Sequence, residues 1–183
     1  MKKISKIKGF TLIEILLVAG VVAVAGLVVY VAFNKAQASN RASTESSYLN
    51  LMSAGIKDLY ASGTVFTGLS NTVILNAKKV PEQMIDTANP TTGIFNTFGG
   101  VVTVVPVTLG GGAANNGYQI TSPSVPQSEC SKLVSGLGNN FQQVTVNGTI
   151  VKTFGTNTGV DIVAAAGQCA AGGNANIMIF ATT

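Results

Sequence analysis

The hydrophobic pattern of the chain begins with one long apolar run. Residues 10–33 contain a single charged residue, Glu14, and no proline. About 20 apolar residues in a helix span the hydrocarbon core of a bilayer, so this run predicts a membrane-crossing helix. Because Lys2, Lys3, Lys6 and Lys8 precede the run, the positive-inside rule places the N-terminus in the cytoplasm and the rest of the chain outside it.

After position 33 the pattern becomes amphipathic without a break, since the first proline is Pro81. Apolar residues at positions 48, 52, 56 and 59 recur at spacings of 4, 4 and 3, which is the period of one helix face. Polar residues such as Arg41, Glu45 and Asp58 are expected on the other faces, and Gly63 is expected to end the helix. The pattern predicts one helix over residues 10–62, whose second half needs a folded partner.

Beyond position 63 the pattern indicates short strands and turns. Residues 99–112 form a β-branched run between glycines and predict a strand, which Pro106 places at a sheet edge. Residues 117–122 are its expected partner. Residues 142–154, with Asn147-Gly148 at their centre, predict a hairpin with a type I′ turn. The continuously apolar segment 176–180 predicts a final, central strand.

Two further segments have helical features. Residues 64–85 combine a turn-rich loop with a short segment that starts at Pro81, a residue suited to the first helical turn. Residues 124–138 predict a short helix capped by Ser124 or Ser128. The predicted fold class is therefore α+β: an antiparallel β-sheet packed on the second half of a long N-terminal helix.

The charge of the chain is concentrated at its start. The net charge is +4, and only 10% of the residues are charged, against roughly 25% in a typical soluble domain. From Phe10 onward seven basic residues (11 − 4) balance seven acidic ones. No cluster of Lys and Arg interleaved with aromatic residues occurs elsewhere, so no specific nucleic-acid site is expected.

The chain has two cysteines, Cys130 and Cys169. They could be reduced core residues, or they could form a disulfide if the domain is exported. The predicted topology places them in an oxidising compartment and favours the disulfide, which would contribute on the order of 3–4 kcal/mol by loop-entropy models.

The stretch KGFTLIEILLV, residues 8–18, resembles the class III signal of type IV pilins. The resemblance implies that a prepilin peptidase cleaves between Gly9 and Phe10, removing a leader of residues 1–9, and that the new amine of Phe10 is N-methylated. It also makes Glu14 the fifth residue of the mature chain.

Two accounts of Glu14 follow. A carboxylate near a helix N-terminus gains from the helix macrodipole, which is a purely local explanation. Alternatively, a carboxylate inside a bilayer costs a few kcal/mol and marks a functional contact. In the second account Glu14 pairs with the amine of Phe10 on a neighbouring subunit, so that both charges leave the lipid together in the core of a filament.

Further stretches resemble the type IVb branch of the family: VPEQM, FGGVVTV, PQSECSKLV and AAGQC. The short leader and Phe10 instead resemble the type IVa branch. The resemblance implies a pilin fold in which residues 10–33 form the membrane and filament-core helix and residues 34–62 its amphipathic half. Residues 63–183 would form the head, with a disulfide-bounded region over 130–169.

The absence of histidine from the sequence excludes His-based metal sites and Ser-His-Asp or Cys-His catalysis, so neither an enzyme nor a cofactor nor a metal is expected. The resemblance implies a major pilin that forms a homo-oligomeric filament for adhesion, motility or mating and DNA transfer. Its other partners would be the prepilin peptidase and the inner-membrane assembly machinery. The precursor would lie in the inner membrane with a periplasmic head. The alternatives are a minor pilin, a secretion-system pseudopilin, or a monomeric membrane-anchored binding module.

Overall fold

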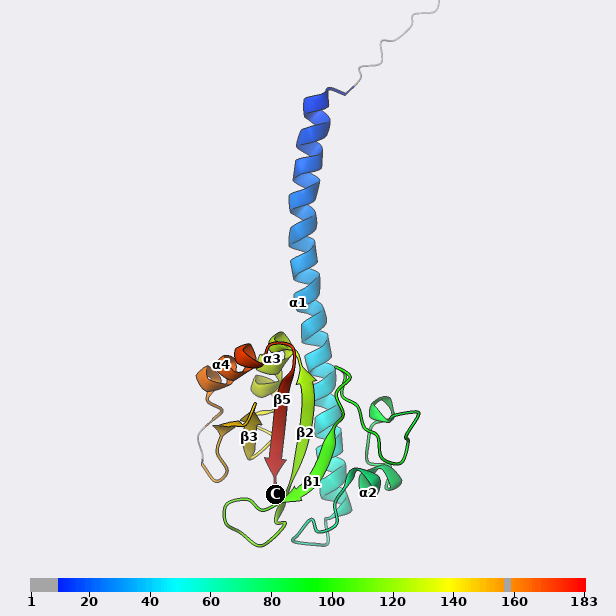
Figure 1. The fold of residues 1–183 in the computed structure, drawn as a ribbon, viewed down its shortest axis with the longest axis vertical. Helices are drawn as coiled ribbons and strands as arrows, with labels where there is room; N and C mark the ends of the chain where they lie inside the picture. The colour runs from blue at the N-terminus through cyan, green and yellow to red at the C-terminus, as the bar shows by residue number, and fades with distance from the viewer. Residues whose placement is uncertain (1–9, 157–158) are drawn as a thin grey trace, which may run out of the picture. The chain divides into compact units, whose positions relative to one another are not determined.

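The computed structural model describes residues 10–156 and 159–183. The chain divides into two compact units, one ending at Gln37 and one formed by Ala38–Thr183, which is called the head below. Helix α1, Leu12–Leu59, belongs to both units (Figure 1). The predicted helix over 10–62 is confirmed with shorter bounds.

The C-terminal end of α1 is set by tighter hydrogen bonds in its last turn. The amide of Ala61 donates to the carbonyl of Asp58 and that of Gly63 to Tyr60. These are bonds to the third preceding residue, which commonly tighten the last turn of a helix. The helical hydrogen-bond pattern therefore stops at Leu59 and a turn follows.

The sheet of the head has five strands in the order β1-β2-β5-β3-β4, and all neighbouring strands are antiparallel. The predicted edge position of the Pro106 strand and the predicted central position of the last strand are both confirmed. The strand bounds are Thr103–Val107 for β1, Gly117–Val125 for β2, Gln143–Val146 for β3, Thr149–Lys152 for β4 and Asn176–Thr182 for β5.

The predicted hairpin joins β3 to β4. Asn147 and Gly148 have φ values of 49° and 84°, and Val146 pairs with Thr149 across the turn. Two successive residues with positive φ are the mark of a type I′ turn, which Asn-Gly favours. The hairpin prediction is confirmed in its turn as well as in its strands.

The free edge of β1 is occupied by a side chain instead of another strand. Asn71 Nδ2 donates to the carbonyl of Val102 at 2.8 Å, and Asn71 Oδ1 accepts from the amide of Val104 at 2.8 Å. The side-chain amide thus makes the pair of bonds that a neighbouring strand would make. Pro106 in the same strand has no N–H to offer, so this edge is blunted against strand addition.

Within the described residues, four short helices complete the head: two lie between α1 and β1, one joins β2 to β3 and one joins β4 to β5. They are α2 (Asn71–Asn76), the 3₁₀-helix η1 (Glu82–Met84), α3 (Gln127–Leu137) and α4 (Ile162–Gly172). The predicted short segment after Pro81 is η1. The helix predicted within 124–138 is α3, but its predicted cap is wrong. Pro126 holds the N-cap position without a side-chain bond, because Ser124 adopts a positive φ and Ser128 bonds to Glu129 instead.

Helices α2 and α4 are additions to the predicted elements. Both begin with a side-chain cap: Ser70 accepts from the amide of Val73, and Asp161 accepts from the amide of Ala164. Such caps satisfy backbone N–H groups that have no partner within the helix. A short capped helix therefore forms wherever tertiary contacts bury one of its faces.

The core of the head lies between α1 and one face of the sheet. The α1 side supplies residues that recur every three or four positions, and Tyr118 of β2 reaches Ser53 of α1 with its hydroxyl at 2.7 Å from Ser53 Oγ. The sheet contributes the side chains at every second strand position, which face the core. The buried residues of α1 are Ala38, Ala42, Glu45, Leu49, Met52, Ser53 and Ile56.

Candidate functional site

The first turn of α1 is closed by a reciprocal pair of bonds between Thr11 and Glu14. The Glu14 amide donates to Thr11 Oγ1 at 3.3 Å, and the Thr11 amide donates to Glu14 Oε2 at 3.3 Å. The Thr11 hydroxyl also lies 3.4 Å from the same carboxylate oxygen. This is a capping box, in which a threonine and a glutamate three residues later satisfy two backbone N–H groups. The pattern T-x-x-E is visible in the sequence at 11–14 and was not used in the prediction.

The residues predicted for processing lie at this end of α1. Gly9 falls outside the described residues. Phe10 is 81% exposed, and it lies on the same side of the helix as Glu14, Ile15 and Val18. The structure thus places Phe10, two residues before the start of α1, on the same side as Glu14.

The surface of α1 around and beyond Glu14 is apolar on all sides. From Phe10 to Phe33 the large apolar side chains are between 51% and 81% exposed. Burial of such a side chain is worth about 1.5–3 kcal/mol, so covering the run is worth tens of kcal/mol. Within the described residues, α1 is the one helix with the length and composition to cross a membrane. This surface therefore requires lipid or protein around it.

Glu14 is the only charge in that apolar surface. Within the part of the chain that the structure describes, Thr11 is the sole donor to its carboxylate, and it binds Oε2. No ion pair to Glu14 occurs there. A charged side chain at the centre of a membrane helix costs about 2.5–3.5 kcal/mol by insertion scales, which is an upper bound for Glu14 in the first turn of α1. The capping box leaves Oε1 open to a further partner.

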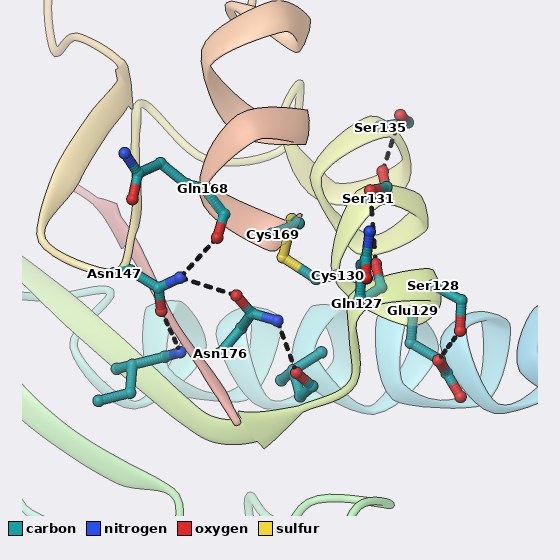
Figure 2. The surroundings of a disulfide bond; sticks show 12 residues. Gln127, Ser128, Glu129, Cys130, Ser131, Ser135, Asn147, Gln168, Cys169 and Asn176 are labelled. Carbon is teal, nitrogen blue, oxygen red and sulfur yellow. Dashed lines mark hydrogen bonds between the residues drawn. A yellow bond between two sulfur atoms is a disulfide. The ribbon is translucent and has the colours of Figure 1, made fainter. Parts of the chain in front are cut away.

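The second predicted feature is the disulfide, which the structure confirms. Cys130 of α3 and Cys169 of α4 are bonded, with a Cα–Cα distance of 5.8 Å, and both residues are fully buried. The bond joins the two helices that lie side by side at one end of the sheet (Figures 1 and 2).

An asparagine pair adjoins the disulfide. Asn147 Nδ2 donates to the carbonyl of Gln168 at 2.8 Å and to Asn176 Oδ1 at 2.7 Å. Asn176 Nδ2 in turn donates to the carbonyl of Val125 at 3.0 Å. Figure 2 shows how this chain of bonds connects the β3–β4 turn, helix α4 and the start of β5. The disulfide region is therefore held by a buried polar network as well as by the bridge.

Comparison with known proteins identifies the family. Residues 39–183 match the family model described as PilS N terminal. The chain is also 31% identical over 156 residues to the major structural subunit of bundle-forming pilus from Escherichia coli O127:H6 (strain E2348/69 / EPEC), and the match covers 82% of this chain and 70% of that protein. The same protein from Escherichia coli O111:H- matches equally well. The chain belongs to the PilS family of type IV pilins.

Solved structures agree with the pilin fold. The crystal structure of a type IVb pilin from Salmonella typhi matches with a TM-score of 0.56 and 21% identity, covering 75% of this chain and 97% of that one. TcpA, a type IV pilin from Vibrio cholerae El Tor biotype, matches with a TM-score of 0.57 and 16% identity over 80% and 99%. The predictions of the pilin fold and of a type IVb-like member are confirmed.

One residue of this pilin departs from its predicted place. Glu45 was expected on a polar face of the helix, but it is fully buried inside the head. Its carboxylate accepts from the amide of Thr97 at 2.9 Å and from Ser122 Oγ at 3.3 Å. Because those partners are about 50 to 80 positions away in the sequence, helical periodicity alone could not reveal them.

A second buried acid of the pilin head lies next to the disulfide. Glu129 is 3% exposed, and its carboxylate accepts from Ser128 and lies 3.7 Å from the guanidinium of Arg41. Arg41 also stacks on the ring of Phe98 at 5.1 Å. Among the described residues no group of three His, Cys, Asp or Glu side chains could hold a metal ion. Glu129 is thus paired with an exposed arginine, whereas Glu45 is held by uncharged hydrogen-bond donors.

Proposed function

We propose that this pilin is the major structural subunit of a type IV pilus. The precursor would be cleaved between Gly9 and Phe10 by a prepilin peptidase, methylated on the new amine, and polymerised into an extracellular filament. Before assembly the apolar part of α1 would hold it in the inner membrane with the head in the periplasm. Inner-membrane assembly machinery would then transfer it from lipid to filament.

The observation that carries this proposal is the exposed apolar surface of α1 in a chain that is 31% identical to major pilus subunits. Lipid covers such a surface before assembly, and the same surface of neighbouring subunits can cover it afterwards. A structural subunit of this kind has no need of a catalytic centre.

Glu14 is proposed to guide assembly. Cleavage before Phe10 creates a positive amine at the end of the same helix face. The amine of one subunit would bind Glu14 Oε1 of its neighbour, so that neither charge remains alone in an apolar environment. The pairing would fix how far one helix is shifted along the next.

Three variants separate this role from local capping. Glu14→Gln keeps an acceptor for the capping box but removes the charge, and it is expected to insert into the membrane and to form few or no filaments. Thr11→Ala breaks the box at a cost of about 1 kcal/mol but keeps the charge, and it is expected to assemble. Glu82→Gln removes an exposed acid of the head and serves as the control.

Filaments would be sheared from cells, counted by electron microscopy and identified by mass. Normal filament numbers from Glu14→Gln would refute the ion pair. Mass spectrometry of the N-terminus tests the wider proposal: a methylated Phe10 in the bulk filament supports the major pilin. A subunit found only in trace amounts would indicate a minor pilin, and an intact Met1 in a functional monomer would indicate an uncleaved membrane anchor.

A further inference from the structure

Glu45 is a fully buried acid on the half of α1 that belongs to the head. Removing an ionised carboxylate from water is costly unless a cation or several hydrogen bonds replace the water. The surroundings of Glu45 therefore determine whether it carries a charge in the folded head.

The Glu45 carboxyl group holds one turn of the chain and one strand against α1. The turn comprises residues 96–100 and is called the 96–100 turn. Glu45 Oε2 accepts from the amide of Thr97 at 2.9 Å, and Oε1 accepts from Ser122 Oγ of β2 at 3.3 Å. Ser122 Oγ itself accepts from Asn96 Nδ2 at 2.9 Å. A single carboxyl group thus connects three segments that are distant in the sequence.

Asn96 gives the 96–100 turn its shape. Its Oδ1 accepts from the amides of Phe98 at 3.0 Å and Gly100 at 2.7 Å, and its Nδ2 donates to the carbonyl of Pro123 at 2.5 Å. The turn is therefore bonded internally and, through Asn96 Nδ2, to β2. Its attachment to α1 depends on Glu45 and on the stacking of Phe98 under Arg41.

The charged groups around Glu45 do not neutralise it. Arg41, one helical turn earlier on α1, directs its guanidinium to Glu129 of α3 and to the Phe98 ring. Strand β2 and the 96–100 turn present hydroxyl and amide groups to the carboxyl. Within the described residues no salt bridge reaches Glu45. Burial therefore raises the pKa of Glu45, and the bonds from Thr97 and Ser122 offset only part of that rise.

The Thr97 hydroxyl also lies beside the Glu45 carboxyl. Its oxygen is the buried side-chain oxygen that lacks a hydrogen-bond partner in the described part of the chain. A hydroxyl both donates and accepts, so it can donate to an ionised Glu45, which lowers the pKa of Glu45, or accept from a protonated Glu45. The two protonation states of Glu45 therefore require different arrangements of the Thr97 hydroxyl.

We propose that Glu45 makes a pH-dependent contact with the 96–100 turn. Protonated Glu45 holds this turn against α1, and ionisation of Glu45 weakens the attachment. The proposal concerns the head alone and is independent of filament assembly. Because the folded head binds this proton more tightly than the unfolded chain does, the stabilisation is fully present below the ordinary glutamate pKa. It is lost as the pH rises through the folded pKa.

The direct test is a titration of the full chain in detergent micelles, labelled with ¹³C at the glutamate carboxyl carbons. The sequence has four glutamates, and Glu45→Gln and Glu82→Gln assign two of the four resonances. The Glu45 resonance is expected to titrate at a higher pH in the folded chain than in the chain unfolded by urea. An equal or lower midpoint in the folded chain overturns the proposal.

Hydrogen exchange tests the consequence for the turn. The protection factor of the Thr97 amide, corrected for the intrinsic effect of pH, is expected to fall in the wild type as the pH rises above the ordinary glutamate pKa. Each unit by which folding raises the pKa corresponds to about a tenfold change. Glu45→Gln keeps an uncharged acceptor and should remove the pH dependence, whereas Glu82→Gln should behave as the wild type. Equal pH dependence in the wild type and both variants overturns the proposal that ionisation of Glu45 weakens the attachment of the turn.

Discussion

Removal of the disulfide provides a quantitative test of how the head is stabilised. The change is the double variant Cys130→Ala, Cys169→Ala. The two residues are 39 positions apart, and loop-entropy models assign a bridge across that separation about 4 kcal/mol at 25 °C. The free energy of unfolding of a small domain is only about 5–15 kcal/mol. The variant head is therefore expected to stay folded at low temperature, but with a much smaller free energy of unfolding.

The loss of stability is expected to be greatest in α4. This helix contains no charged residue and buries only Ala165 and Cys169, while Val163 is 84% exposed. Besides the bridge, the cap by Asp161 and the bond from Asn147 to the carbonyl of Gln168 hold it. With the bridge absent, α4 is therefore expected to open before the sheet does, and its amides should lose hydrogen-exchange protection first.

Urea unfolding of the full chain in detergent, followed by near-ultraviolet circular dichroism, measures the difference. A reducing agent provides the control, because it should lower the midpoint of the wild type toward that of the variant and leave the variant unchanged. A free energy of unfolding within about 1 kcal/mol of the wild type would show that the packing of α3 and α4, and not the covalent link, stabilises this region.

Three other variants test single contacts of the head. Asn71→Ala leaves the Val102 carbonyl and the Val104 amide at the sheet edge without partners. It should lower the free energy of unfolding, measured in urea, by about 2 kcal/mol. The control Asn76→Ala, in the same helix, should have little effect. Burial raises the pKa of Tyr118 to about 12, so the folded head retains this proton more tightly and loses stability as the pH rises from about 10 to 12. Tyr118→Phe should flatten that alkaline loss of melting temperature, at a cost of about 1 kcal/mol at neutral pH for the lost bond to Ser53. Gly148→Ala places a side chain at a φ of 84° and should cost about 1 kcal/mol by thermal unfolding; an unchanged melting temperature would contradict the type I′ turn.

The parts of the fold that were predictable are those whose signal is local. The apolar run of α1, the Asn147-Gly148 turn and the edge position of Pro106 each depend on a few consecutive residues. Their physical causes are membrane burial, positive φ and a missing N–H, and none of these requires knowledge of the rest of the chain. Glu14 lies in the first turn of α1 as predicted, whereas Phe10 precedes the helix, which begins at Leu12.

The parts that were missed depend on tertiary contacts. Helix α4 has small and apolar residues on every face, so it shows no helical periodicity, and the bridge that joins it to α3 comes from a cysteine 39 positions away. Helix α2 has six residues, too few for a periodic pattern. Glu45 looks like a solvent-facing position until Thr97 and Ser122 are brought to it. In each case the decisive partner lies far away in the sequence.

The capping box sharpens the question of why position 14 is an acid. Glu14 and Thr11 satisfy each other at the start of α1, which gives the side chain a local structural role. Glutamine fills the same position of a capping box, however, and it would avoid the cost of a charge inside a bilayer. Capping therefore accounts for a polar side chain at this position but not for its charge. The helix macrodipole favours a negative charge here by about 0.3–1 kcal/mol, which is less than the charge costs inside a bilayer. We therefore propose that a cation meets it, and the amine that cleavage would create at Phe10 is one that the chain itself can supply. The comparison of Glu14→Gln with Thr11→Ala thus separates the two roles of one side chain.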